Sequence, residues 1–236
     1  MKVAILYSGG KDSTYAIDYA KSRGWDVRYL LSVKPSRKDC FLFHFATVEH
    51  TPKLAQILNI RHILLGCDVA DPAQEADIVK QEVLRQQQSD PVEAVILGGT
   101  GLQETQLRSI QKALLPFKIE VFAAHAEYDH EDIFRQMVAK GYEIMVTQVA
   151  SDGLMKWLGQ KITKDNFDKL SKDSKKYGFH IGFEGGYADT LVVAGPIFGN
   201  SKLEITKAEK IVDDAYCGHI IAATRIVAKP AIEQNQ

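Results

Sequence analysis

Six consecutive residues near the amino terminus have the composition of a phosphate-binding loop. Ser8-Gly9-Gly10-Lys11-Asp12-Ser13 directly follows an apolar run at residues 3–6. Two adjacent glycines cost backbone entropy unless their freedom is used, and here they would let the backbone approach a phosphate closely. The loop amides and the dipole of a following helix form an anion site, to which the two serines add hydroxyl donors and the lysine adds positive charge. We therefore expect a phosphate group at residues 8–13.

Asp12 does not suit a bare anion site, because its carboxylate would repel a phosphate. A bound Mg²⁺ resolves that conflict, since Mg²⁺ in proteins is held by one or two carboxylates together with substrate phosphates. The spacing is neither that of the Walker A loop nor that of a dinucleotide-binding G-x-G-x-x-G. A glycine pair alone would favour a tight turn, with Ser8 or Asp12 capping a helix. The full string after a strand favours the phosphate site.

The elements predicted around this loop alternate between strand and helix. Apolar runs predict strands at residues 2–7, 25–33, 61–65, 94–97 and 119–123. Helical periodicity predicts helices at residues 12–24, 47–58, 73–88 and 103–114. Such alternation is typical of a parallel sheet covered on both faces. Ligands of these sheets lie beyond the carboxyl ends of the strands, where residues 8–13 and Gly98-Gly99 would meet.

The pattern becomes richer in strands after residue 124. Helices are predicted at 131–140 and 164–176, and strands at 143–149, 190–193, 202–212 and 219–227. We therefore expect an α/β protein with two domains. Residues 1–124 would form a Rossmann-like nucleotide-binding domain, and residues 125–236 a smaller α+β domain that recognises the substrate.

Composition restricts the range of functions. The 236 residues carry a net charge of -1, so no global field favours nucleic acid or membrane, and direct nucleic-acid binding is not expected. No apolar run is long enough to span a bilayer, and no signal-peptide pattern opens the chain. The three cysteines, Cys40, Cys67 and Cys217, are widely spaced, which indicates a reducing, cytoplasmic setting and no structural zinc. The sequence leaves open whether the protein forms a homodimer.

The string at residues 8–13 resembles the PP-loop, S-G-G-x-D-S, of the ATP pyrophosphatases. Members of that superfamily cleave ATP between its α- and β-phosphates and attach AMP to a substrate, which a nucleophile then attacks. The resemblance implies an AMP-forming reaction with ATP and Mg²⁺ on an adenine nucleotide alpha hydrolase-like sheet. It identifies a superfamily and leaves the acceptor open.

A second segment narrows the family. Phe183-Glu184-Gly185-Gly186, followed by Thr190-Leu191-Val192 and Gly195-Pro196-Ile197-Phe198, resembles the E-G-G-E-[FY]-x-T-L-V segment of the diphthine–ammonia ligases. Residues 141–146, 157–160 and 43–44 resemble the same family, so the likeness extends from residue 1 to about 228. It implies that the diphthine carboxylate of elongation factor 2 is activated as an acyl-adenylate and then amidated by ammonia.

The resemblance implies roles for individual residues. Catalysis would involve Lys11, Asp12 and Glu184, with Asp12 also on the metal. The nucleotide would contact residues 8–13, Ser32, Lys34, Gly98 and Gly99, and the acceptor would contact Arg108, Glu184, Gly185, Gly186, Tyr187, Asp189 and Thr190. Tyr187 stands where the family has a second glutamate, and its ring could face the trimethylammonium group of diphthine.

Two other functions remain open on the sequence. The chain could adenylate a different carboxylate or amide, or it could bind ATP or AMP without catalysis. His44, His50, His62 and His125 lack metal-ligand spacing, so we expect structural or surface roles for them.

Overall fold

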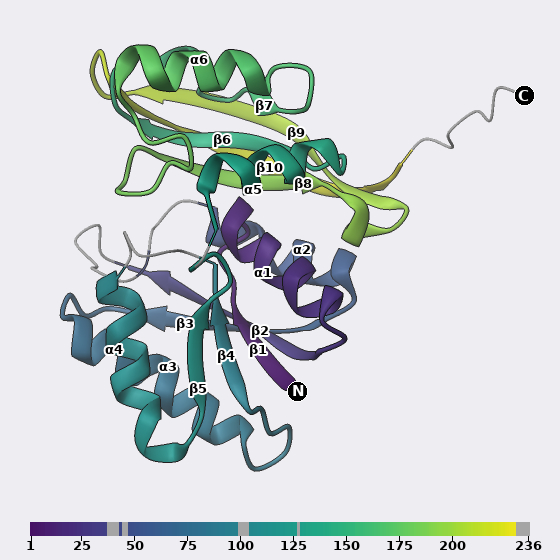
Figure 1. Cartoon of the computed structure of the whole chain (residues 1–236), viewed down its shortest axis with the longest axis vertical. Helices are drawn as coiled ribbons and strands as arrows, with labels where there is room; N and C mark the ends of the chain where they lie inside the picture. The colour runs from purple at the N-terminus through teal and green to yellow at the C-terminus, as the bar shows by residue number, and fades with distance from the viewer. Residues whose placement is uncertain (37–42, 44–46, 99–103, 127, 230–236) are drawn as a thin grey trace, which may run out of the picture.

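The computed structural model describes residues 1–36, 43, 47–98, 104–126 and 128–229 (Figure 1). Within them the chain forms two five-stranded sheets. The first has the order β3-β2-β1-β4-β5, and every neighbouring pair is parallel. Its strands are β1 Lys2–Leu6, β2 Asp26–Pro35, β3 Arg61–Cys67, β4 Ala94–Leu97 and β5 Glu120–Ala123.

Helices cover both faces of this sheet because its strands alternate apolar side chains between the two sides. In β1, Val3 and Ile5 join one core cluster, whereas Ala4 and Leu6 join the other. α1 and α2 pack on the first side, and α3 and α4 on the second. The helices are α1 Lys11–Ser22, α2 Thr51–Leu58, α3 Pro72–Gln86 and α4 Glu104–Leu114, with short 3₁₀ turns at Val48–His50 and Leu115–Phe117.

The strand order places the predicted phosphate loop at a favoured ligand position. The chain runs outward from β1 through β2 to β3 and then returns to the other side of β1 as β4. In open α/β sheets a crevice forms beyond the carboxyl end of the strand where the order reverses. Here that strand is β1, and residues 8–13 follow it directly.

The second sheet is antiparallel and belongs to the carboxyl-terminal lobe, residues 130–229. Its order is β7-β6-β10-β9, and β8 pairs with β6 along most of that strand, from Glu143 to Val149. Its elements are α5 His130–Ala139, β6 Glu143–Ala150, β7 Lys161–Ile162, α6 Phe167–Tyr177, β8 Ala188–Ala194, β9 Ser201–Val212 and β10 Cys217–Ala228, with 3₁₀ turns at Met155–Trp157 and Pro196–Phe198. The predicted α/β class, a Rossmann-like sheet with a smaller α+β unit, is confirmed.

The two lobes share one hydrophobic core. The cluster that contains Ile5 and Ile17 of the first lobe continues into Met145 and Leu191 of the second. The second sheet lies over α1 and α2 (Figure 1). A backbone hydrogen bond of 2.9 Å from Val192 to the Gly9 carbonyl fixes β8 directly against the phosphate loop.

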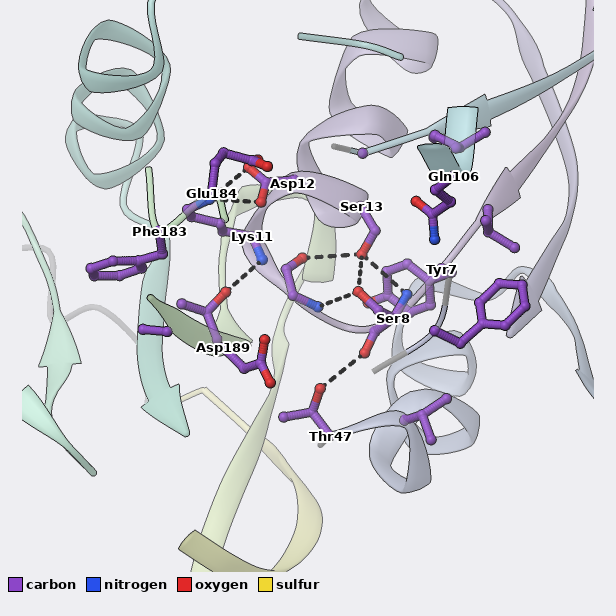
Figure 2. Close-up of a pocket in the computed structure, with 18 of the residues that line it drawn as sticks. Tyr7, Ser8, Lys11, Asp12, Ser13, Thr47, Gln106, Phe183, Glu184 and Asp189 are labelled. Carbon is purple, nitrogen blue, oxygen red and sulfur yellow. Dashed lines mark hydrogen bonds and ion pairs between the residues drawn. The ribbon is translucent and has the colours of Figure 1, made fainter. Parts of the chain in front are cut away.

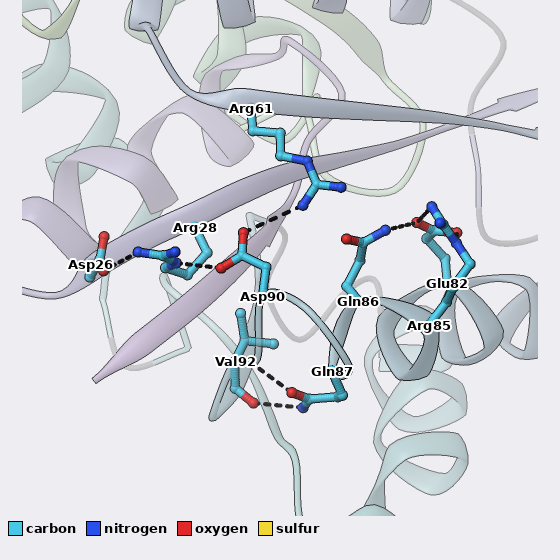
Figure 3. A network of polar contacts seen from close by, with 9 residues as sticks. All are labelled: Asp26, Arg28, Arg61, Glu82, Arg85, Gln86, Gln87, Asp90 and Val92. Atoms are coloured by element: carbon cyan, nitrogen blue, oxygen red, sulfur yellow. Dashed lines mark hydrogen bonds and ion pairs between the residues drawn. The ribbon is translucent and has the colours of Figure 1, made fainter.

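The opposite edge of the parallel sheet is held by charged pairs (Figure 3). Asp90, in the turn before β4, accepts hydrogen bonds from Arg28 at 2.6 Å and from Arg61 at 3.4 Å. Arg28 also bonds to Asp26 at 2.9 Å. These contacts tie together the amino ends of β2 and β3, so the network supports the sheet from the edge away from the loop. Among the described residues, no helix combines the length and apolarity needed to cross a membrane.

Candidate functional site

The phosphate loop is shaped by its contacts with β8 and α2. Gly9 adopts a left-handed φ of +82°, and a Cβ there would lie 3.0 Å from Leu54 of α2. Gly10 is the N-cap residue of α1 and has no side chain that could cap the helix. The Lys11 amide donates to the Thr190 hydroxyl at 3.1 Å. The amino terminus of α1 therefore opens toward the space between the loop and β8.

The hydroxyl groups of the loop lie together. Ser13 Oγ accepts from the Ser8 amide at 3.2 Å and lies 3.2 Å from Ser8 Oγ, while the Thr47 hydroxyl donates to the Ser8 carbonyl at 3.2 Å. A Cβ on Gly98, at the end of β4, would lie only 2.2 Å from the Ser13 nitrogen. This close approach requires glycine and brings the end of β4 to the start of α1.

One pocket lies between the loop and the segment that leads into β8 (Figure 2). Including the solvent at its mouth, the empty space of this pocket measures about 960 Å³. The first lobe contributes Ser8, Gly10, Lys11, Asp12, Ser13, Thr47, Gly98 and Gln106 to its lining, and the second contributes Gly182, Phe183, Glu184, Gly186, Asp189 and Thr190. Residues far apart in sequence thus meet at the predicted edge of the sheet.

Lys11 and Asp12 form a largely buried ion pair at the base of the pocket. Lys11 Nζ lies 2.7 Å and 2.6 Å from the two oxygens of Asp12, and Lys11 is 3% exposed. Burial acts to raise the pKa of the Asp12 carboxyl, but the Lys11 ammonium, together with smaller effects of His125 and His130, lowers the pKa below its usual value. Asp12 is therefore an anion at neutral pH.

Glu184 lies beside this pair and is 2% exposed. Neither of its carboxylate oxygens has a hydrogen-bond partner among the described residues. Burial, followed by the negative charge of Asp12, raises the pKa of Glu184 to about 7, although Lys11 acts in the opposite direction. A raised pKa of this kind indicates that the cations and hydrogen-bond donors among the described residues stabilise the charged form of the carboxyl group too weakly to offset its burial.

A strained turn aims Glu184 inward. Phe183, Gly185 and Gly186 have φ values of 61°, 87° and 84°, in the left-handed region. Phe183 holds that conformation because its ring is buried and packs against Phe134 and Phe179. A bulky residue adopts such a φ only where the surroundings impose it, and such strain is concentrated at functional sites.

His125, for which the sequence predicts a structural or surface role, lies buried next to Asp12. Its Nδ1 lies 3.5 Å from an oxygen of Asp12, and the residue is buried. Burial lowers the pKa of His125 to about 4, so the imidazole is neutral at physiological pH. The ring of His130 lies 6.2 Å from that of His125, and the ring of His180 lies 4.7 Å beyond it. These three histidines flank the Lys11–Asp12 pair on the side of the second lobe.

Several residues predicted to contact ligand lie elsewhere. Ser32 is fully buried, donates to the Tyr7 carbonyl at 2.6 Å and lies 2.9 Å from His62, so its hydroxyl is used inside the sheet. Lys34 is exposed and borders a separate depression between β2 and β3. Arg108 is exposed and pairs with Glu104 on its own helix.

Gly185 and Tyr187 do not line the pocket either. The Tyr187 ring packs over Gly185, whose added Cβ would lie 3.8 Å from it, at the outer side of the turn. Gly99 lies outside the described residues. The structure thus brings Ser8, Gly10, Lys11, Asp12, Ser13, Gly98, Glu184, Gly186, Asp189 and Thr190 into one pocket.

Thr47 and Gln106 line the pocket and were missed from the sequence (Figure 2). For Gln106 a signal existed. It lies two positions before Arg108 on a helix, and residues two apart point to opposite faces. A helix that presents Arg108 to solvent therefore turns Gln106 inward. Thr47 had no comparable signal.

Comparison with known proteins places this site in a family. The family description "Diphthamide synthase N-terminal domain" matches residues 1–113, and "Diphthamide synthase C-terminal domain" matches residues 129–226. A human protein named diphthine--ammonia ligase is 25% identical over 242 residues, covering 91% of this chain and 86% of that protein. A protein of the same name from Schizosaccharomyces pombe is 26% identical over 238 residues, covering 93% of this chain and 38% of that protein.

Among solved structures, one from Methanocaldococcus jannaschii, described as a predicted subunit of tRNA methyltransferase, aligns with a TM-score of 0.42 and 15% identity over 83% of this chain and 98% of that chain. The two family domains together span most of the sequence and include both walls of the pocket. The chain therefore belongs to the diphthamide synthase family.

Proposed function

We propose that this protein is a cytoplasmic, ATP-dependent and AMP-forming ligase that amidates the diphthine carboxylate of elongation factor 2 with ammonia. Family membership and the name shared by its relatives supply the reaction class. One observation carries the proposal: the phosphate loop of the first lobe lines the same pocket as Glu184, Gly186, Asp189 and Thr190 of the second. ATP and an acceptor group can meet there.

ATP would bind with its phosphates on the loop. The open amino terminus of α1, the hydroxyls of Ser8 and Ser13, and the ammonium of Lys11 all favour a polyphosphate there. The apolar side chains of Val33, Phe43, Val48 and Leu97 line the same pocket. They suit the adenine base.

Mg²⁺ fits this donor set. The carboxylate of Asp12 lies at the phosphate loop, and the orphaned, buried carboxylate of Glu184 lies beside it. Asp12 would hold the ion together with phosphate oxygens, as Mg²⁺ sites usually combine carboxylates with substrate phosphates. When bound, the ion supplies positive charge that offsets the charge of the triphosphate and of the departing pyrophosphate.

The reaction needs activation because a carboxylate does not react with ammonia. An oxygen of the diphthine carboxylate would attack the α-phosphorus, breaking its bond to the bridging oxygen of pyrophosphate. Ammonia would then attack the acyl carbon of the resulting adenylate, AMP would leave with the original carboxylate oxygen, and a proton would be released. The loop amides and Lys11 would orient the phosphates and stabilise their charge.

The acceptor would enter from the side of β8. Asp189 lines the pocket there and offers a negative charge to the quaternary ammonium of diphthine. Gly186 lets a substrate chain pass close to the backbone, and Tyr187 lies just outside the pocket as an aromatic neighbour. Because the acceptor is a side chain on a folded protein, the open mouth of the pocket is a requirement of this function.

The test incubates the full chain with ATP, Mg²⁺, isotopically labelled ammonium and elongation factor 2 that carries diphthine. We expect the label to enter the elongation factor, with AMP and pyrophosphate formed in equal amounts. If AMP forms only with another acceptor, the substrate is wrong. ATP binding without any pyrophosphate release would contradict ligase activity altogether.

A further inference from the structure

The Glu184 carboxylate is not placed to contact a bulky acceptor cation. Both of its oxygens are buried and have no hydrogen-bond partner among the described residues. A trimethylammonium group could reach them only after the surrounding side chains moved. The carboxylate instead faces the Lys11–Asp12 pair, whose charges both act on it (Figure 2).

The charges around Glu184 do not balance. Asp12 and Glu184 supply two carboxylates, whereas Lys11 is the one ammonium that bonds to either of them among the described contacts. His125, which approaches Asp12, is buried, and neither of its ring nitrogens has a hydrogen-bond partner in the described part of the chain. An unpaired buried carboxylate is costly, and it becomes stable when paired with a cation or bound to a metal. Counted over the described side chains, these carboxylates therefore have too little positive charge beside them.

A strained backbone conformation holds Glu184 in this position. The preceding Phe183 holds a left-handed φ of 61°, a costly conformation for a bulky residue. Two glycines with φ above 80° follow, and the chain then enters β8, which is anchored to the loop through Val192 and Gly9. The turn thus delivers a carboxylate from the second lobe to the phosphate loop of the first.

We propose that Glu184 and Asp12 together hold one Mg²⁺ ion across the seam between the two lobes, so that Glu184 is a metal ligand and does not bind the acceptor cation. The proposal rests on the proposed function only in taking ATP as the nucleotide that accompanies the ion. Hard oxygen ligands suit Mg²⁺, which keeps several water or phosphate ligands besides one or two carboxylates. No group of three or more His, Cys, Asp or Glu side chains in the described parts of the chain is arranged to hold a metal. The ion would therefore arrive with the nucleotide.

This assignment gives the acidic side chains of the pocket two different roles, metal binding and acceptor binding. Glu184 and Asp12 lie close together in the pocket, and Asp189 lies farther from them (Figure 2). Asp189 would then contact the acceptor. A metal ligand from each lobe also means that binding of the ion and nucleotide links the two lobes directly.

The test measures the affinity of the protein for Mn²⁺, a paramagnetic substitute for Mg²⁺, by electron paramagnetic resonance. A non-hydrolysable ATP analogue is present, and no acceptor is added. Wild type is compared with Glu184→Gln, which keeps the shape of the side chain and removes its charge. The matched control is Asp189→Asn, which removes a charge from the same pocket. We expect Glu184→Gln to weaken Mn²⁺ binding at least tenfold and Asp189→Asn to leave it within twofold. Glu184→Asp, with a shorter carboxylate, should fall between them.

The nucleotide supplies a second readout. Without metal, Glu184→Gln should bind the analogue at least as tightly as wild type, because a negative charge near the phosphates has been removed. Mn²⁺ affinity equal to wild type in Glu184→Gln would overturn the proposal, as would equal losses in Glu184→Gln and Asp189→Asn. Because no acceptor is present, a failure to amidate diphthine would contradict the proposed function and leave this result standing.

Discussion

At the residue scale, the buried carboxyl of Glu184 should control how the stability of the protein without ligand depends on pH. Its pKa is raised to about 7 in the folded protein from 4.5. Between these values the folded state binds more protons than the unfolded state. The stability associated with this group is therefore complete below about 4.5 and is lost as the pH rises through 7.

Glu184→Gln should remove that loss. We expect the variant to gain roughly 2–4 kcal/mol in free energy of unfolding over wild type at pH 8, relative to the difference at pH 5, since each unit of pKa shift corresponds to about 1.4 kcal/mol. Urea unfolding at the two pH values, without nucleotide or metal, measures it. A difference between the two proteins that does not change with pH would show that the carboxyl is not perturbed in this way.

Asp12 should be needed for turnover more than for nucleotide binding. In Asp12→Asn we expect the Mg²⁺-dependent rate of AMP formation to fall roughly a hundredfold or more, because charge stabilisation by a metal is worth several kcal/mol. ATP affinity should be partly kept. Asp18→Asn is the control. Asp18 lies on the same helix as Asp12 and pairs with Lys140, and its replacement should keep the rate. Normal turnover in Asp12→Asn would show that its assigned role is wrong.

At the element scale, the packing of β4 against α1 should depend on the absence of a side chain at Gly98. An added Cβ would lie 2.2 Å from the Ser13 backbone, which cannot move without shifting the loop. We expect Gly98→Ala to lose about 1–3 kcal/mol of stability, as overpacked cores do, together with most ATP affinity. Thermal unfolding and nucleotide titration measure both.

The control for this prediction is Gly66→Ala in β3, where an added Cβ meets nothing within 4 Å. It should change stability by less than about 0.5 kcal/mol, as open surface positions do. Equal effects of the two substitutions would mean that close packing at Gly98 does not determine the shape of the loop.

Sequence patterns predicted the elements well where one physical signal dominated. The central strands β1 and β4 of the parallel sheet are buried on both faces and so appear as short apolar runs, as at residues 94–97. The short strand Lys161–Ile162 was missed because two residues carry no periodicity. The turn at Phe183 could not be predicted, since its left-handed backbone is imposed by tertiary packing on an aromatic residue that does not favour it.

The pocket was predicted in part for similar reasons. Residues 8–13 and Gly98 follow parallel strands, and the carboxyl ends of such strands meet at one edge of the sheet. His125 gave no signal, because its contact with Asp12 depends on where the chain leaves β5. Ser32 follows the same strand-end rule, yet its side chain is used within the sheet. Which way a side chain points at a strand end depends on register, which a single sequence leaves open.

At the scale of the whole molecule, the shared core predicts that both lobes unfold together. The two tryptophans report on separate lobes, Trp25 beside β2 and Trp157 after β6. In Trp157→Phe, fluorescence of Trp25 should follow the same urea transition as the far-ultraviolet circular dichroism of the whole chain. The reciprocal variant, Trp25→Phe, is the matched control. Separate midpoints would mean that the lobes are independent domains.

The central claim is that ATP and the acceptor carboxylate meet in the pocket between the lobes and form an acyl-adenylate. Its most direct test uses diphthine-bearing elongation factor 2 whose diphthine carboxylate carries a heavy oxygen isotope, with ATP, Mg²⁺ and ammonium. Mass spectrometry of the released nucleotide should find one labelled oxygen in AMP for each amide formed, because the attacking oxygen leaves with the phosphate. Amide formed with unlabelled AMP, or with label in pyrophosphate or inorganic phosphate, would contradict the account.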